Sequence, residues 1–152
     1  MSAETDLIKL YSGRILSLAA SIPRTGRLPQ PDATVTKRSP LCGSTVTVDV
    51  LMRDGRVSDY AQDVKACALG QAAAAVVGEV APGRTAEDLR AAASELRAML
   101  KDGGPVPGAP WSAFEVLEPA RDYRNRHASI LLTIEAAAEA AERASAEART
   151  GA

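Results

Sequence analysis

The sequence predicts an α+β fold in which a small, mainly antiparallel three-stranded sheet packs against several helices. One run alternates polar and apolar residues and ends at Asp54-Gly55, a strong signal for a two-residue hairpin turn. Elsewhere apolar residues recur at helical spacing. We expect one domain over residues 1–152, with flexible ends at about 1–5 and 146–152.

Composition and charge narrow the class of protein. Hydrophobic residues make up 46% of the chain but aromatic residues only 3%, which predicts a thin, alanine-rich and mainly helical core. Lys and Arg number 18 against 19 Asp and Glu, and this balance argues against nucleic acid or a membrane as partner. Since neither a long apolar run nor a basic leader is present, we expect a cytoplasmic protein. In that reducing compartment the two cysteines should be thiols, metal ligands or redox groups rather than a disulfide.

The first half of the chain is expected to form one helix, a surface loop and the three strands. Prolines and a glycine interrupt the helical pattern and make the loop. Alternation then places Val46, Val48, Val50 and Met52 on one face of the middle strand, towards the core, and Asp49 on the other face. In chain order, these elements are expected at residues 6–21, 21–31, 33–37, 45–52 and 56–65.

The second half is expected to be helical. The first of its helices consists almost entirely of small residues, which lets it lie close to the sheet. Thr85 is the expected N-cap of the second, with acidic residues in its first turn. Trp111 and Phe114 should dock a short third helix on the core. The expected helices cover about 68–78, 86–102, 109–117, and from 122 or 125 to about 149.

Three residues are candidates for chemistry. Cys42 follows Pro40 in the turn before the middle strand, and the hairpin should bring Cys67 to the same end of the sheet. Cys67 begins a helix, where backbone N–H groups favour the thiolate that binds metals and attacks electrophiles. His127, the only histidine, should point inward from the last helix, near an N-terminus that favours neutral, metal-binding imidazole. A purely structural role for these residues is the alternative interpretation.

Taken together, these motifs resemble a known family. Ser39-Pro40-Leu41-Cys42-Gly43 precedes a hairpin, Cys67 opens an Ala-rich helix, and a last helix begins near Arg124-Asn125-Arg126-His127. This arrangement resembles the U-type iron–sulfur cluster scaffold family, which comprises IscU, SufU and the N-terminal domain of NifU. The resemblance spans roughly residues 7–141 and includes the segment 24–33.

The resemblance implies a SufE/NifU-like fold and a site for a metal or cluster. Cys42 and Cys67 match the first two cysteines of the family, His127 falls where a third cysteine is expected, and Ser44 takes the place of an acid. The chaperone-recognition motif of IscU is missing, and an extra stretch at about 105–118 is similar to SufU. We therefore interpret the chain as a SufU-like or divergent NifU-like member.

By this resemblance, Cys42, Cys67 and His127 would hold zinc, iron or a nascent [2Fe–2S] cluster. A cysteine desulfurase would supply sulfur, with Cys42 as the possible persulfide acceptor, and recipient apo-proteins would be further partners. The fourth ligand is left open between water, incoming sulfur, Ser44, Asp63 and Asp122. We expect a scaffold or sulfur carrier rather than a turnover enzyme, and a monomer or weak homo-oligomer.

Two other functions are compatible with the same residues. The chain could be a zinc-binding or adaptor homologue that does not assemble clusters. It could also be a Cys–His hydrolase, with a cysteine as nucleophile and His127 as base. Several basic residues near the candidate site form either a solvated surface or a docking rim for an acidic partner loop; they are Lys37, Arg38, Arg121, Arg124 and Arg126.

Overall fold

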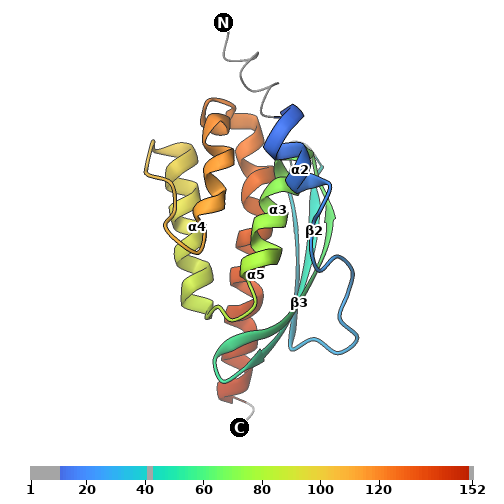
Figure 1. Cartoon of the computed structure of the whole chain (residues 1–152). Coiled ribbons are helices and arrows are strands. Elements are labelled where there is room, and N and C mark those ends of the chain that lie inside the picture. The colour runs from blue at the N-terminus through green and yellow to red at the C-terminus, as the bar shows by residue number, and fades with distance from the viewer. Residues whose placement is uncertain (1–10, 41–42, 151–152) are drawn as a thin grey trace, which may run out of the picture.

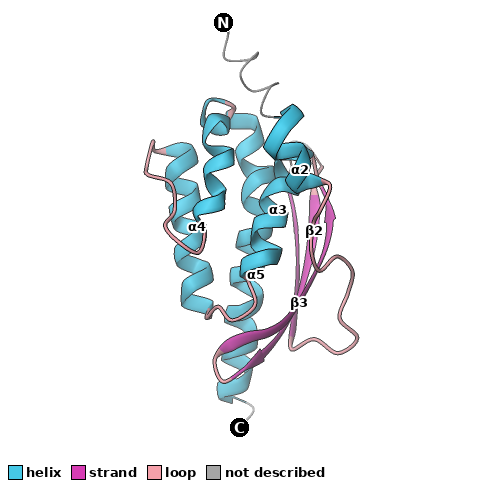
Figure 2. Ribbon diagram, in the orientation of Figure 1, coloured by secondary structure: helices cyan, strands magenta, loops and turns pink. Residues whose placement is uncertain are grey.

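The computed structural model describes residues 11–40 and 43–150, and the side chains of residues 13–40 and 43–146. Helices cover one face of a three-stranded antiparallel sheet (Figures 1 and 2), which confirms the predicted α+β class. In chain order the elements are η1 (Tyr11–Ile15), α2 (Leu16–Ala19), β1 (Ala33–Arg38), β2 (Thr45–Arg53), β3 (Arg56–Lys65), α3 (Ala68–Val80), α4 (Ala86–Lys101), η2 (Ser112–Asp122) and α5 (Arg124–Thr150).

The sheet has the order β1-β2-β3, so β2 is its centre. On this strand Val48 pairs with Val35 of β1 and with Gln62 of β3. The turn between β2 and β3 has positive φ at Asp54 (55°) and Gly55 (78°), as the Asp-Gly signal predicts. The three valines predicted to face the core are buried, because α5 packs against this side of β2.

The opposite face of the sheet is partly covered by the loop before β1. Asp49 lies on that face as expected, yet its side chain is 0% exposed. Arg27 donates two hydrogen bonds to its carboxylate, at 2.7 and 3.2 Å, and the Leu28 N–H and Thr34 hydroxyl donate at 3.0 and 2.5 Å. Alternation along β2 could not predict this burial, since it arises from a loop folding back across the sheet.

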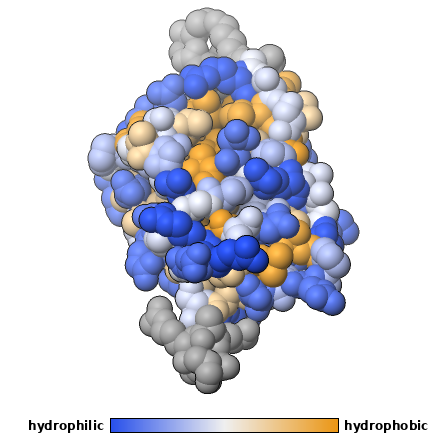
Figure 3. Space-filling view, turned by 60° about the horizontal axis from the view of Figure 1, so that its bottom comes forward, coloured by the Kyte–Doolittle hydropathy of each residue, from blue (hydrophilic) through white to orange (hydrophobic). Residues whose placement is uncertain are grey.

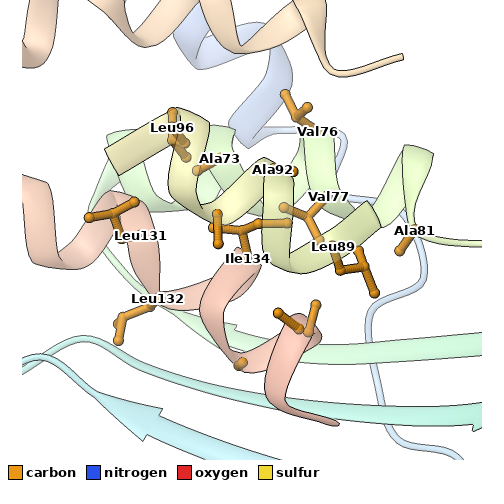
Figure 4. Close-up of a cluster of buried hydrophobic side chains, with 14 of the residues drawn as sticks. Ala73, Val76, Val77, Ala81, Leu89, Ala92, Leu96, Leu131, Leu132 and Ile134 are labelled. Carbon is orange, nitrogen blue, oxygen red and sulfur yellow. The ribbon is translucent and has the colours of Figure 1, made fainter. Parts of the chain in front are cut away.

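The main core lies between three helices. The helices α3 and α5 lie between the sheet and α4 (Figure 1). Figure 4 shows side chains from all three helices meeting, among them Val77 of α3, Leu89 of α4 and Ile134 of α5. Each of these three side chains is fully buried. Because α5 also contacts β1 and β2, it fixes the position of the sheet relative to the other helices.

The helix starts follow the predictions closely. Cys67 is the N-cap of α3, and Thr85 is the N-cap of α4. The Thr85 hydroxyl accepts a hydrogen bond from the Asp88 N–H at 3.0 Å, and the Asp88 carboxylate accepts one from the Thr85 N–H at 3.1 Å. This reciprocal capping box satisfies two N–H groups that the helix itself leaves unpaired.

Two predicted helices differ from the structure. Of the helix expected over 6–21, residues 6–10 lie outside the described residues, and the described part is broken at Gly13, whose φ and ψ are −116° and −111°. The short helix expected over 109–117 is a 3₁₀ helix that continues through Pro119 to Asp122. Its rings dock as predicted, because Trp111 and Phe114 are buried and stacked with centroids 5.7 Å apart.

The surface composition and the helix lengths complete the description of the fold. On the face in Figure 3, hydrophobic areas are interspersed with hydrophilic side chains. None of the helices within the described ranges combines the length and the apolar composition needed to span a membrane.

Candidate metal or cluster site

Four segments meet at one end of the sheet. β1 ends and β2 begins there, α5 packs against both strands, and α3 starts shortly after Lys65 of β3, which pairs with Thr45. The turn between β1 and β2 is closed by hydrogen bonds from the Ser39 N–H to the Ser44 carbonyl (2.8 Å) and from the Gly43 N–H to the Ser39 carbonyl (3.0 Å). Cys42 belongs to this turn in sequence, but it lies outside the described residues.

Cys67 is a half-buried free thiol at this end. Its backbone is extended (φ −67°, ψ 170°), and its side chain does not cap α3. The sulfur instead lies 3.5 Å from the hydroxyl of Ser129, in the second turn of α5. The Ser129 hydroxyl is in turn 3.0 Å from the buried Ser44 hydroxyl. A row of two hydroxyls and one thiol therefore joins the start of β2, α5 and the start of α3.

His127 is 1% exposed, as the inward-facing prediction requires. Its Nε2 is 3.0 Å from the carbonyl oxygen of Ala120. A carbonyl can only accept, so Nε2 carries a proton here, and in the neutral ring Nδ1 presents a lone pair. Nδ1 is buried and has no hydrogen-bond partner among the residues that the structure describes. Metal-bound histidines commonly use one ring nitrogen for the metal and donate the other N–H to a backbone carbonyl.

Cys67 and His127, the two described members of the predicted ligand set, have different hydrogen-bonding neighbours. His127 and Ser129 are two positions apart on α5 and so point in very different directions around the helix. Accordingly, Ser129 meets Cys67, whereas His127 meets Ala120. Among residues 11–40 and 43–150, no group of three His, Cys, Asp or Glu side chains is close enough to hold a metal ion. The full set of Cys42, Cys67 and His127 stays a prediction, because Cys42 lies outside those ranges.

The candidate fourth ligands lie in three different places. Ser44 is buried in the hydroxyl row. Asp122 lines a hollow of about 470 Å³ that His127 also lines. Asp63 pairs with Thr47 and interacts electrostatically with Arg27, so it lies on the outer face of the sheet. The sheet therefore separates Asp63 from the hydroxyl row, and we do not retain it in the proposed ligand set.

Ser129 is the site residue that sequence reasoning missed. Helical periodicity marked only one stripe of α5, but nearly every side of this helix is buried between positions 127 and 141. A useful signal was available in the sequence: a hydroxyl directly before the apolar run Ile130-Leu131-Leu132, two residues from the only histidine. A buried serine needs a hydrogen-bond partner, and here the partners are another hydroxyl and a thiol.

Basic residues border the site, as the sequence suggested. The hollow beside His127 is lined by Lys101, Arg121 and Arg124, and a second hollow of about 360 Å³ is lined by Lys37 and Arg38. Two of these cations form ion pairs, Lys37 with Glu139 at 3.3 Å and Arg121 with Glu118 at 3.1 Å.

Comparison with known proteins fits this fold. The solved N-terminal part of a nitrogen-fixing NifU-like protein from Brucella abortus aligns with 96% of this chain and 99% of its own, at 46% identity and a TM-score of 0.90. A Fervidobacterium islandicum protein, assigned as an iron–sulfur cluster assembly scaffold for the SUF system, aligns with 88% of this chain and 97% of its own. Its identity is 19% and its TM-score 0.77, so it supports the fold alone.

Comparison with curated proteins gives a more distant match. Two iron–sulfur cluster assembly scaffold proteins of Archaeoglobus fulgidus, IscU 1 and IscU 2, are each 25% identical over 79 residues. This match spans 52% of the present chain and about half the length of each relative, also 52%. No protein-family model matches the chain.

The fold and the thiol-bearing helix start are those of a small α+β scaffold domain. Because the NifU-like relative is 46% identical over nearly the whole length of both chains, the protein belongs to the U-type iron–sulfur cluster scaffold family. This confirms the resemblance proposed from the sequence, and the match lies on the NifU-like side.

Proposed function

We propose that this protein is an iron–sulfur cluster assembly scaffold or sulfur acceptor, which holds zinc, iron or a nascent [2Fe–2S] cluster through Cys42, Cys67 and His127. The assembly role is taken from the Archaeoglobus IscU relatives and from family membership. The proposal includes a cysteine desulfurase and recipient apo-proteins as partners. It also includes the cytoplasmic location, the single domain, and the monomer or weak homo-oligomer expected from the sequence.

The observation that carries the proposal is the state of His127. A buried nitrogen without a partner is costly, and native structures rarely keep one without a reason. Here the second ring nitrogen is already fixed by Ala120, so the Nδ1 lone pair is oriented rather than free to rotate toward another donor. A metal ion is the kind of ligand that satisfies a lone pair held in this way.

The proposed ligand side chains are suited to zinc or to an iron–sulfur cluster. Two thiolates and one imidazole are good ligands for zinc, and three protein ligands leave a fourth position open. Imidazole also replaces thiolate on iron in some [2Fe–2S] centres and raises the reduction potential. Ser44 and Asp122 stay candidates for the fourth position, because Ser44 is linked to Cys67 through Ser129 and Asp122 lines the same hollow as His127.

Sulfur acceptance requires a thiolate, and we assign this step to Cys42. Its thiolate would attack the terminal sulfur of a persulfide on the desulfurase, and the enzyme's cysteine thiolate would leave as the S–S bond breaks. The product is a Cys42 persulfide, with no change in the overall number of electrons. Cys67 is the less suitable acceptor, because it is held at the start of α3 against Ser129.

The first test is the metal and acid-labile sulfide content of protein purified without oxygen. We expect near-equal iron and sulfide, or zinc alone, in the wild type, and loss of either in Cys42→Ser, Cys67→Ser and His127→Ala. Asp63→Ala is the matched control and should keep the wild-type content, since Asp63 lies across the sheet. A wild type that binds neither metal nor sulfide, even after reconstitution, would contradict the scaffold and favour the adaptor alternative.

The second test is sulfur transfer. A cysteine desulfurase supplied with ³⁵S-cysteine should label the wild type and Cys67→Ser through a reductant-sensitive bond, but not Cys42→Ser. Label retained in Cys42→Ser would overturn the assignment of the acceptor. The Cys–His hydrolase alternative gains no specific support, because the described contacts of Cys67 include the Ser129 hydroxyl and no imidazole.

A further inference from the structure

The Ser44–Ser129–Cys67 row connects the two segments that carry the thiols. Ser44 lies two positions after Cys42 in the sequence, and Cys67 is the N-cap of α3. Ser129, on a third element, is within hydrogen-bond distance of both: 3.0 Å to the Ser44 hydroxyl and 3.5 Å to the Cys67 sulfur. Ser129 is 1% exposed and Ser44 is 5% exposed, so bulk water does not compete for these bonds.

A glycine in α3 makes room for this hydroxyl. A Cβ added to Gly70 would lie 2.7 Å from the Ser129 Oγ and 3.2 Å from the Ser129 carbonyl oxygen. It would also lie 2.8 Å from the Cβ of Ala66. The first turn of α3 can therefore approach α5 at Ser129 only because position 70 has no side chain. This close approach brings the Ser129 hydroxyl to the sulfur of Cys67, three residues before Gly70.

The donor and acceptor assignment follows from the chemistry of the sulfur. A serine hydroxyl has one proton to donate and two lone pairs to accept with. A thiolate, whether free or bound to a metal, can only accept, so Ser129 must donate to Cys67 in that state. Ser129 can then accept from the Ser44 hydroxyl, and hydrogen bonds in such a chain strengthen one another in a low-dielectric site.

We propose that Ser129 is a positioning residue for the metal or cluster site: its hydroxyl donates to the Cys67 thiolate, accepts from Ser44, and so fixes the Cys67 sulfur relative to the start of β2. This inference rests on the proposed function, because it assigns Ser129 a hydrogen bond to the proposed ligand Cys67. The expected consequence is a higher affinity for the metal and a weaker donation of charge from the sulfur to it.

The test uses cobalt(II) as a spectroscopic substitute for zinc, and zinc itself in competition with a chromophoric chelator. Loss of a hydrogen bond to a metal-binding side chain typically weakens metal binding by about 10–100-fold. We expect Ser129→Ala to weaken zinc binding by about tenfold, at the lower end of that range, and to shift the thiolate-to-cobalt absorption band to lower energy. Ser44→Ala should change both readouts in the same direction but less, since it keeps the direct bond to sulfur.

Two further variants control the experiment. Thr133→Val removes another buried hydroxyl one turn along α5 and should leave affinity and band position unchanged. Gly70→Ala keeps the hydroxyl but displaces it, and should reproduce the Ser129→Ala effect. If Ser129→Ala does not fold, as judged by circular dichroism, Ser44→Ala decides the question. Wild-type affinity and an unshifted band in both serine variants would overturn the inference.

Failure of the proposed function would look different. In that case the wild-type protein itself would show no thiolate-to-cobalt band and no competition for zinc. A wild type that binds both metals, combined with serine variants that behave identically to it, would remove only the role of Ser129.

Discussion

Two polar clusters lie on opposite faces of the same sheet, and they differ in how completely their hydrogen bonds are satisfied. On the outer face, the buried carboxylate of Asp49 accepts four hydrogen bonds from Arg27, Leu28 and Thr34. On the helix side, His127 is also buried, but one of its two ring nitrogens has no partner in the part of the chain that the structure describes. Both clusters place costly polar groups in the interior, yet only the first is complete within the described residues.

This difference separates a structural cluster from a candidate binding site. When every polar group of a buried network is hydrogen-bonded, the network stabilises the folded state. Removing part of it should therefore lower the free energy of unfolding. A buried polar group that lacks a partner is kept in place by the surrounding fold. Its removal should reduce ligand affinity rather than stability. Substitutions on the outer face should therefore lower stability and leave metal binding unchanged, whereas substitutions on the helix side should mainly weaken metal binding.

The largest expected effect is on the outer face. Asp49→Ala leaves Arg27, the Leu28 N–H and the Thr34 hydroxyl without their acceptor and should lower the free energy of unfolding by roughly 3 kcal/mol. Metal content should stay at the wild-type level. Urea unfolding followed by circular dichroism measures the first quantity. A loss below 1 kcal/mol would show that the loop over the outer face contributes little.

Part of that stability should depend on pH. Burial alone would raise the pKa of Asp49, but hydrogen bonds from Arg27, Thr34 and the Leu28 N–H, together with the Arg27 charge, hold the pKa below its ordinary value. The unfolded chain then binds the proton more readily, so the contribution is complete above the unfolded pKa, about 4, and is lost as the pH falls through the folded pKa. The stability of Asp49→Asn should fall less steeply with decreasing pH in this range. If the free energy of unfolding falls equally steeply in both proteins, the Asp49 carboxylate does not cause the pH dependence.

The opposite profile is expected for His127. His127→Leu fills a similar volume and removes one hydrogen bond to Ala120, so we expect it to lower stability by only about 1 kcal/mol. Zinc affinity should fall by tenfold or more, through the loss of a ligand. Competition with a chelator measures the zinc affinity, and urea unfolding of the same preparation measures the free energy of unfolding. A variant with lost stability but wild-type zinc affinity would place His127 with the structural residues.

The smallest effects concern the two helix starts. α4 begins with a capping box and acidic residues, whereas α5 begins with Arg124 and Arg126 and has no acid in its first turn. Thr85→Ala should cost about 1 kcal/mol, because it removes the cap. Arg126→Glu should add roughly 0.3–0.5 kcal/mol, because a negative charge suits the positive end of the helix dipole. Thermal unfolding measures the change in stability of each variant. Equal losses of stability in Thr85→Ala and Arg126→Glu would contradict the difference expected between the two helix starts.

The sequence predicted those features whose causes are local. Asp54-Gly55 determines the hairpin through its own backbone preferences, and Thr85 with Asp88 determines the start of α4 through bonds within one turn. Cys67 was likewise placed correctly at a helix N-cap. Each of these depends on a few neighbouring residues, so one sequence was sufficient.

The features that were missed depend on distant contacts. Asp49 is buried because a loop more than twenty positions earlier folds across the sheet. Ser129 joins the site because Gly70, on another helix, leaves space for it. Periodicity cannot report either contact, since it records only which side of one element is apolar. The position of His127 was predicted, but the unpartnered Nδ1 and its fixed Nε2 became visible only in the structure.

The edges of the sheet carry a further consequence. The free side of β3 is occupied twice by other parts of the chain: Thr25 bridges to Gln62, and Thr85 bridges to Arg56. No described segment pairs with the free side of β1, which ends in Lys37 and Arg38. Among the described strands, only β1 therefore offers an unpaired edge to a second copy. Lys37 near its end is paired with Glu139, so Arg38 is the charge that would oppose such pairing.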